Sequence, residues 1–247
     1  MYLTTRALVL RTTDYNDRDT LLTLLTPQHG KLTAKVRGLR RKNSPLTAAC
    51  QILTCSDFTL FEYGGFYTVN EATPVAIFHG LRKDLTKLSL GTYCAQVADV
   101  LSQEDLPNPE LLSLILNCLH VLSQNEQPEE KVKAVFELRC ACLSGYMPDL
   151  GGCNRCQTEN ADFFDLSAGH LECFSCRNED AHGIRLPVTP SVLKAMRYIV
   201  YCQPKKLFSF TLGEEAMTQL SQITEAYLTT QLERGFSTLD FYKSLLI

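Results

Sequence analysis

The sequence predicts an α+β protein of several domains: a small β-barrel, then a bundle of helices interrupted by a lobe with four cysteines. Short β-rich segments separated by turn residues fill the first 78 of 247 residues, and apolar residues at helical spacing dominate most of the remainder. Two closely spaced cysteine pairs fall inside the helical part. We expect a barrel domain over residues 1–78, helical parts over 79–148 and 185–247, and a cysteine lobe over 149–184.

Five strands are expected in the N-terminal segment, over residues 3–12, 20–26, 31–36, 52–62 and 66–75. The last two flank Gly64-Gly65, a hairpin signal. Five strands in so short a segment favour a closed barrel of the OB type, because closure removes exposed sheet edges. An SH3-like barrel is the alternative.

Helices are expected where apolar residues recur every three to five positions. Proline and acidic residues mark some of their starts: Pro128 is followed by Glu129 and Glu130, and Thr189-Pro190 is typical of an N-cap and first helical residue. We interpret all the apolar helix faces as core packing. The expected helices begin near residues 81, 111, 128, 190, 213 and 237, with Pro107 and Pro109 as a break before the second.

The four cysteines of the lobe follow the pattern C-x2-C-x16-C-x2-C, with Cys153, Cys156, Cys173 and Cys176. This spacing is typical of a zinc site, and it predicts one structural ion, because four thiolates leave no open coordination position. Nearby His170 and His182 are alternative ligands, but four thiolates already complete the shell. Unpaired structural cysteines and disulfides are the competing interpretations. Seven further cysteines lie in apolar segments, which suits a reducing, cytoplasmic compartment.

Composition is that of an ordinary globular protein, with 45% hydrophobic and 21% charged residues. No apolar run reaches about 18 residues and no signal peptide is evident, so we expect no membrane association. The net charge of −3 conceals an asymmetry. Residues 1–45 hold nine Lys and Arg against three Asp, whereas the remainder is acidic. Such a split suggests that one segment contacts a polyanion.

The positive charge gathers on the third expected strand and the loop after it. Cations without an acid among them can follow nucleic-acid phosphates by charge alone, although a solvated loop is the plainer interpretation. Six aromatic residues are available for base stacking: Tyr15, Phe58, Phe61, Tyr63, Phe66 and Tyr67. We expect most of them in the core, and Tyr15 and Tyr63, next to turns, are the better candidates. The candidate DNA-binding residues are Lys31, Lys35, Arg37, Arg40, Arg41 and Lys42, with Arg11 and Arg18 as extensions.

Catalytic motifs are absent from the sequence. We find no phosphate-binding loop, no nucleophile elbow and no H-E-x-x-H motif. Asp14, Asp17 and Asp19 are spaced as metal-binding carboxylates can be, but they flank an evident turn. The sequence therefore predicts a protein that is not an enzyme.

The order of these parts resembles the RecO family of bacterial recombination mediators over the full length. A barrel at the N-terminus, a basic loop after its third strand and a four-cysteine lobe within helices occur in the same order. The resembling stretches are residues 5–17 (TRALVLRTTDYND), 23–31 (TLLTPQHGK), 36–41 (VRGLRR), 138–139 (LR), 145–148 (GYMP) and 153–156 (CNRC).

The resemblance implies a non-enzymatic, nucleoid-associated bacterial protein. Such proteins bind single- and double-stranded DNA and anneal complementary strands. With RecR they help load RecA onto strands covered by single-strand-binding protein, whose acidic tail family members can bind. In this sequence the DNA role would fall on the basic residues named above.

Two functions of other classes remain open at this stage. A zinc-dependent nucleic-acid enzyme would need an open metal position or a carboxylate cluster, and neither is evident. A zinc-ribbon adaptor would bind only protein, with the basic loop incidental. Binding of single-stranded DNA measured against salt separates an adaptor from a mediator.

Overall fold

The computed structural model describes residues 1–177 and 183–246. They form two compact units. The first comprises residues 1–126 together with the C-terminal residues from 236 on, and the second comprises residues 127–235. These units group the elements differently from the four expected segments, because the last helix belongs with the first unit. The four-segment division stays a prediction.

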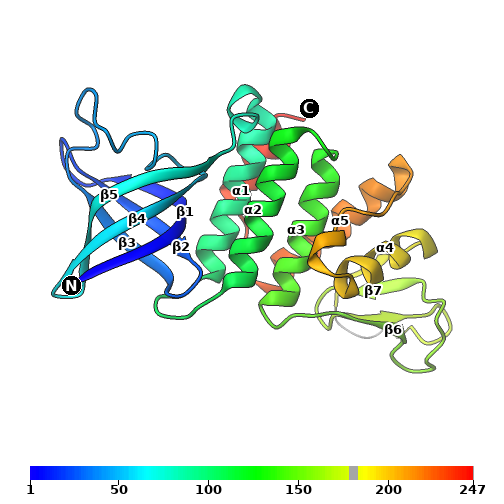
Figure 1. Ribbon diagram of the computed structural model, residues 1–247. Helices are drawn as coiled ribbons and strands as arrows, with labels where there is room; N and C mark the ends of the chain where they lie inside the picture. The colour runs from blue at the N-terminus through cyan, green and yellow to red at the C-terminus, as the bar shows by residue number, and fades with distance from the viewer. Residues whose placement is uncertain (178–182, 247) are drawn as a thin grey trace. The chain divides into compact units, whose positions relative to one another are not determined.

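Five strands close into a barrel in the first unit (Figure 1). The strand order is β1-β2-β3-β5-β4, and antiparallel β1–β4 pairing closes the ring. Alternating side chains such as Leu22, Leu24 and Phe58 fill the interior. The α+β fold class and the closed five-stranded barrel are thus confirmed. The strands are β1 (Tyr2–Asp14), β2 (Thr20–Thr26), β3 (Gly30–Val36), β4 (Thr54–Tyr63) and β5 (Phe66–Ile77).

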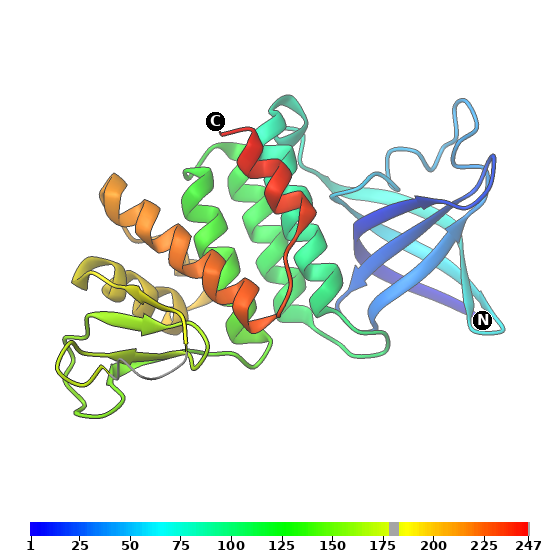
Figure 2. The ribbon, with the colours of Figure 1, turned by 180° about the vertical axis from the view of Figure 1, so that it is seen from behind.

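Three α-helices complete the first unit: α1 (Leu85–Leu101), α2 (Pro109–Gln124) and α6 (Ser237–Ser244), with a 3-10 turn, η1 (Leu81–Lys83), before them. Asp84 accepts the Thr86 amide at 3.0 Å and so caps α1. Figure 2 shows α6 lying along α1, and the two helices are in contact. The C-terminal helix therefore packs on elements that precede it by about 140 residues, as the Thr238–Gln96 hydrogen bond shows.

The second unit combines three helices with a small sheet. Helix α3 packs on α4 and α5, and the sheet has the order β6-β8-β7-β9. The sequence did not predict this sheet, because three of its strands have only three residues. The elements are α3 (Glu129–Leu143), β6 (Asp149–Cys153), β7 (Phe163–Asp165), β8 (His170–Glu172), β9 (Arg185–Pro187), α4 (Pro190–Tyr201), η2 (Pro204–Lys206) and α5 (Glu214–Gln231).

Most helix starts agree with the expected ones, but α1 begins at Leu85 rather than near residue 81, because residues 81–83 form a 3-10 turn and Asp84 caps the helix. A second difference concerns α4. Thr189 is the N-cap of α4, but its side chain makes no capping hydrogen bond. Its hydroxyl donates instead to Gln219 on α5 at 2.7 Å. This residue therefore ties two helices together, where the sequence indicated only a local cap.

A buried ion pair joins α3 to α5. Lys133 Nζ lies 3.1 Å from Glu137 Oε1 and 2.8 Å from Glu225 Oε2, and its side chain is only 4% exposed. Glu137 is fully buried and also accepts a hydrogen bond of 2.9 Å from Thr224. Both charges thus keep polar partners, which burial of an ion requires.

Replacing Lys133 with Met should lower the free energy of unfolding by about 3–5 kcal/mol, because Glu137 would keep its burial and lose its cation. The double variant Lys133→Met, Glu137→Leu removes the two buried charges and leaves Glu225, whose side chain is 21% exposed, so we expect it to recover most of that loss. Urea denaturation of both variants measures the difference. An equal loss in the two would show that packing, not charge, dominates at this position.

Candidate nucleic-acid interface and metal centre

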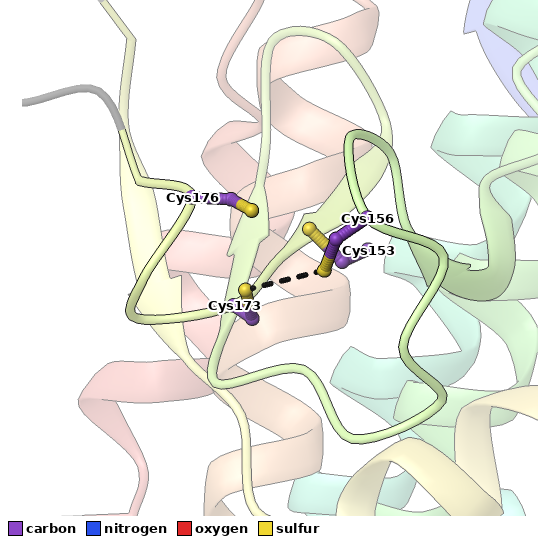
Figure 3. A group of neighbouring side chains, drawn as sticks. All are labelled: Cys153, Cys156, Cys173 and Cys176. Atoms are coloured by element: carbon purple, nitrogen blue, oxygen red, sulfur yellow. Dashed lines mark hydrogen bonds between the residues drawn. The ribbon is translucent and has the colours of Figure 1, made fainter.

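The four cysteines predicted from the sequence come together in the second unit (Figure 3). Cys153 is the last residue of β6, and Cys173 directly follows β8, the neighbouring strand. The four Sγ atoms all lie within 4.8 Å of one another, and those of Cys156 and Cys173 are 3.6 Å apart. The small sheet thus brings to one point two cysteine pairs that are separated by 16 residues in the sequence.

Tight turns carry each cysteine pair. The Gln157 amide donates to the Cys153 carbonyl at 2.9 Å, and the Arg177 amide donates to the Cys173 carbonyl at 3.0 Å. The first turn packs closely against Gly152, where an added Cβ would lie 2.8 Å from the Thr158 carbonyl oxygen. A larger residue at this position would push the turn away from β6.

The backbone around Cys153 favours a thiolate. Burial opposes the charged form, but the backbone amides of Cys156, Arg155 and Cys173 are directed at its sulfur and lower its pKa to about 6. Cys176 behaves oppositely, because hydrogen bonds with Cys173 and Cys156 raise its pKa to about 12. Four thiolates this close repel one another, so a cation is required for all of them to ionise together.

The cluster has the size of a tetrahedral zinc site. Around a zinc ion with bonds of 2.3 Å the sulfur atoms lie about 3.8 Å apart, which is close to the 3.6 Å between Cys156 and Cys173 and below the 4.8 Å that bounds all the Sγ separations. Of the alternative ligands, His170 is engaged elsewhere, with its Nε2 2.8 Å from Asn154 Nδ2. His182 lies outside the described residues.

A second group of potential metal ligands, Asp165, His170 and Glu172, lies beside the cysteines. Arg185 already supplies a cation there: its Nε is 2.7 Å from Glu172, and its Nη2 is 3.6 Å from Asp165. These contacts connect β7, β8 and β9 in register. We therefore interpret this group as a structural brace of the sheet.

The basic residues lie on the barrel and in the loop that follows β3. Ion pairs divide them into two sets. Four have carboxylate partners: Lys31 and Arg11 with Asp99, Lys35 with Asp19, and Arg40 with Asp14. Within the part of the chain that the structure describes, no ion pair is found for the other four, which are all exposed: Arg18, Arg37, Arg41 and Lys42.

Lys31 is the most constrained of the paired residues. Its Nζ donates to the Asp99 carbonyl at 2.7 Å and lies 3.1 Å from the Asp99 carboxylate, so it links β3 to α1. Three of the four cations without a partner lie in the loop over residues 37–45. The DNA contacts of all eight residues stay a prediction, and the second set is the one free to meet a phosphate.

Asp19 contacts several segments around the basic loop. Its Oδ1 accepts the Gly38 amide at 2.9 Å, and its Oδ2 lies 2.9 Å from Lys35 Nζ and accepts from Asn16 at 3.1 Å. The carboxylate thus connects the β1–β2 loop, strand β3 and the basic loop. These contacts argue against the metal-binding alternative for Asp14, Asp17 and Asp19, because a lysine holds the carboxylate of Asp19.

Among the aromatic stacking candidates, Tyr15 is 57% exposed and Tyr63 is 79% exposed. Lys35 Nζ lies 4.7 Å from the centre of the Tyr15 ring. Phe58 is buried in the barrel core, whereas Phe66, beside the β4–β5 turn, is as exposed as Tyr63.

Comparison with known proteins covers nearly the whole chain. The family model "Recombination protein O N terminal" matches residues 1–78, and "Recombination protein O C terminal" matches residues 82–240. The "DNA repair protein RecO" of Acetivibrio thermocellus is 32% identical over 250 residues, which cover 99% of this chain and 97% of that protein. The chain belongs to the RecO family.

Further RecO proteins show the same breadth of similarity. That of Alkaliphilus metalliredigens is 29% identical over 99% of this chain and all of its own length. That of Bacillus subtilis is 28% identical over 89% of this chain and 86% of its own. In the part of this RecO family member that the structure describes, no helix is both long and apolar enough to span a bilayer.

Sequence reasoning found the cysteines and the basic segment but missed the carboxylates that partner the cations. Asp99 carried no signal, because it lies on a helix far along the chain from Lys31. Asp19 did have a local signal: Asn16 precedes it by three residues, and the Asn16 side chain accepts the Arg18 and Asp19 amides at 3.0 and 2.7 Å. This Asx turn could have indicated an ordered loop.

The Asp19 contacts make a prediction about pH. The Gly38 amide, Lys35 and Asn16 lower the pKa of Asp19 to about 2 in the folded protein. Because the folded-state pKa is depressed, the stabilisation is complete above the unfolded value of about 4 and is lost as the pH falls towards 2. Asp19→Asn should therefore be less stable than the natural protein at pH 7, and the difference should shrink as the pH falls from 4 to 2.

Urea denaturation midpoints across this pH range test that expectation. Asp17→Asn is the matched control, because it removes the same charge from the same loop without touching the Gly38 and Lys35 contacts. It should stay near the natural protein at pH 7. A gap between Asp19→Asn and the natural protein that persists at pH 2 would show that the charge of Asp19 is not what stabilises the loop.

Proposed function

We propose that this protein is a non-enzymatic mediator of recombinational DNA repair. It binds single- and double-stranded DNA through the barrel and the basic loop, and it anneals complementary strands. With RecR it helps load RecA onto single strands covered by single-strand-binding protein, at the bacterial nucleoid. The observation that carries this proposal is the exposed positive charge beside a closed barrel, which has no carboxylate partner among the described residues, in a chain that matches a DNA-repair family over nearly its whole length.

The charge distribution suits strand annealing. Two strands must approach while their phosphates repel each other, and a cationic surface reduces that repulsion without breaking a bond. Arg37, Arg41 and Lys42 are exposed and, within the described residues, have no carboxylate at ion-pair distance. Release of counterions from the phosphates supplies the free energy of such binding, so little dependence on base sequence is expected.

No part of this proposal requires catalysis. Annealing and loading need binding and release, and the four-thiolate centre suits a structural metal because zinc there would have no open position. We propose that Cys153, Cys156, Cys173 and Cys176 hold one zinc ion that fixes the small sheet against the turns.

Replacing Arg37, Arg41 and Lys42 together with Ala should weaken binding to single- and double-stranded DNA alike. Each lost phosphate contact reduces the slope of log affinity against log salt by roughly 0.7 on single strands, so the slope should flatten by about 2. Fluorescence anisotropy with labelled oligonucleotides between 50 and 200 mM salt measures both quantities, a range over which phosphate contacts change affinity by orders of magnitude.

The matched control removes three exposed cations from the second unit, Lys194, Lys205 and Lys206. It changes the net charge equally, and we expect affinity and slope to stay near those of the natural protein. If the control loses affinity and the loop variant does not, the DNA surface lies on the second unit. If the natural protein binds no DNA, the chain is better explained as a zinc-ribbon adaptor.

Protein purified without chelator should contain about one equivalent of zinc, measured by elemental analysis. Structural zinc contributes on the order of 10 kcal/mol to folding in small zinc modules, so Cys173→Ser should destabilise the second unit strongly. Cys202→Ser, at a half-buried cysteine outside the cluster, is the control and should keep its zinc. Less than about half an equivalent in the natural protein would argue against the site.

A further inference from the structure

The cysteine cluster of the second unit is partly open to solvent. Cys156 is exposed and Cys176 is half-buried, whereas Cys153 and Cys173 are buried. A structural four-thiolate centre needs no access from solvent, because no ligand enters or leaves it. An accessible cysteine sulfur is also the kind that small oxidants reach and modify. The exposure of Cys156 therefore indicates chemistry beyond holding a metal.

The exposed sulfur lies beside a buried one from the other cysteine pair. Cys156 Sγ is 3.6 Å from Cys173 Sγ (Figure 3). The S–S bond of a disulfide is about 2.05 Å long, so the two sulfur atoms need to approach each other by about 1.5 Å. Small rotations of the two side chains supply this movement. Such a bond would connect the first cysteine turn to the second, which is the same link that a zinc ion would make.

Both cysteine turns are anchored to β8 by hydrogen bonds that involve no metal. In the first turn, the Asn154 amide donates to the Leu171 carbonyl at 2.9 Å. In the second turn, the Phe174 amide donates to Asp162 Oδ2 at 2.7 Å, and the Asp162 amide donates to the Glu172 carbonyl at 3.0 Å. Leu171 and Glu172 both belong to β8. The sulfur atoms therefore remain neighbours when a metal is lost, as formation of a disulfide from an oxidised cysteine requires.

We propose that hydrogen peroxide converts Cys156 and Cys173 into a disulfide, which then takes over the link between the two cysteine turns. No DNA contact enters this inference, so it goes beyond the proposed repair function. It rests on the proposed zinc site only where it concerns release of the ion, since the disulfide itself depends on the positions of the two sulfur atoms.

The reaction consumes one peroxide for each disulfide. The Cys156 thiolate attacks one peroxide oxygen, the O–O bond breaks, the sulfur becomes a sulfenic acid, and hydroxide leaves. The Cys173 thiolate then attacks the Cys156 sulfur, so that the S–S bond forms while the S–O bond breaks and a second hydroxide leaves. The two hydroxides take up two protons from solvent. The two thiolates have lost two electrons, and the peroxide has been reduced to two molecules of water.

Oxidation should separate loss of the metal from loss of structure. Cys153 and Cys176 remain as thiolates, and they are half of the ligand set that a structural zinc ion uses, so zinc should leave as the disulfide forms. The disulfide closes the chain between Cys156 and Cys173 and limits the conformations of the unfolded state. The oxidised second unit should therefore stay folded without a metal.

Peptide mapping of the natural protein tests the bond. Protein purified with its zinc is treated with hydrogen peroxide, free thiols are alkylated, and the peptides are separated without reductant. We expect Cys156 linked to Cys173 and about one zinc ion released for each disulfide, measured with a chromogenic chelator. Addition of a dithiol and zinc should reverse both changes. Cys202→Ser is the matched control, because it removes a half-buried cysteine outside the cluster and should change neither result.

Thermal unfolding tests the structural role of the bond. Two metal-free forms are compared: protein oxidised with peroxide, and reduced protein treated with chelator. The oxidised form should have the higher melting temperature, and a reductant should abolish the difference. In Cys156→Ser, which lacks the sulfur that peroxide reaches first, peroxide should leave the melting temperature of the chelated protein unchanged.

The outcomes separate this inference from the zinc proposal. Disulfides within the pairs, between Cys153 and Cys156 or between Cys173 and Cys176, would overturn it, because they leave the two turns unconnected. An oxidised form that melts no higher than the chelated one would also overturn it. Free thiols and bound zinc after peroxide treatment would refute the disulfide and leave the zinc proposal intact. If the natural protein contains no zinc, the zinc proposal fails, and the peptide map by itself decides whether the disulfide forms.

Discussion

One carboxylate orders the side of the barrel that carries the basic loop. Asp19 contacts three parts of this surface at 2.9–3.1 Å: Asn16 in the β1–β2 loop, Lys35 on β3, and Gly38 at the start of the basic loop. Without this carboxylate, the β1–β2 loop and the basic loop would sample more conformations, and a ligand that binds there would have to order them. An acidic residue can thus order a surface whose proposed ligand is an anion.

The basic residues of the barrel and the basic loop have different roles that depend on where they lie. Lys31 and Arg11 contact Asp99, so part of the positive charge stabilises the packing of α1 against the barrel. Three of the four basic residues that have no ion pair within the described part of the chain lie in the loop after β3. The net charge of −3 for the chain conceals this local positive charge. The acidic remainder of the chain limits non-specific attraction of polyanions to other parts of the molecule.

The sequence predicted those features that local patterns encode. Alternating residues such as those of β3 specified the barrel strands, and the doubled C-x2-C spacing specified the cysteine cluster. It did not predict the sheet of the second unit, because strands of three residues are too short to show a period. Nor did it predict the ion-pair partners of Lys31 and Lys35, because a cation's partner depends on tertiary contacts that charge patterning does not encode. Phe66 was noted as aromatic but was not singled out, since exposure beside a turn cannot be read from residue type.

The return of α6 to α1 has a consequence for how the chain is made. Residues 2–77 contain all five barrel strands, so the barrel can close on the ribosome soon after they emerge. The helical part of the same unit must wait for residue 244, the last of α6, after the whole second unit has been synthesised. Until translation ends, the α1 surface that α6 covers is exposed to solvent and to chaperones. Nascent chains stalled before residue 237 should therefore carry a finished barrel beside an unfinished helical layer.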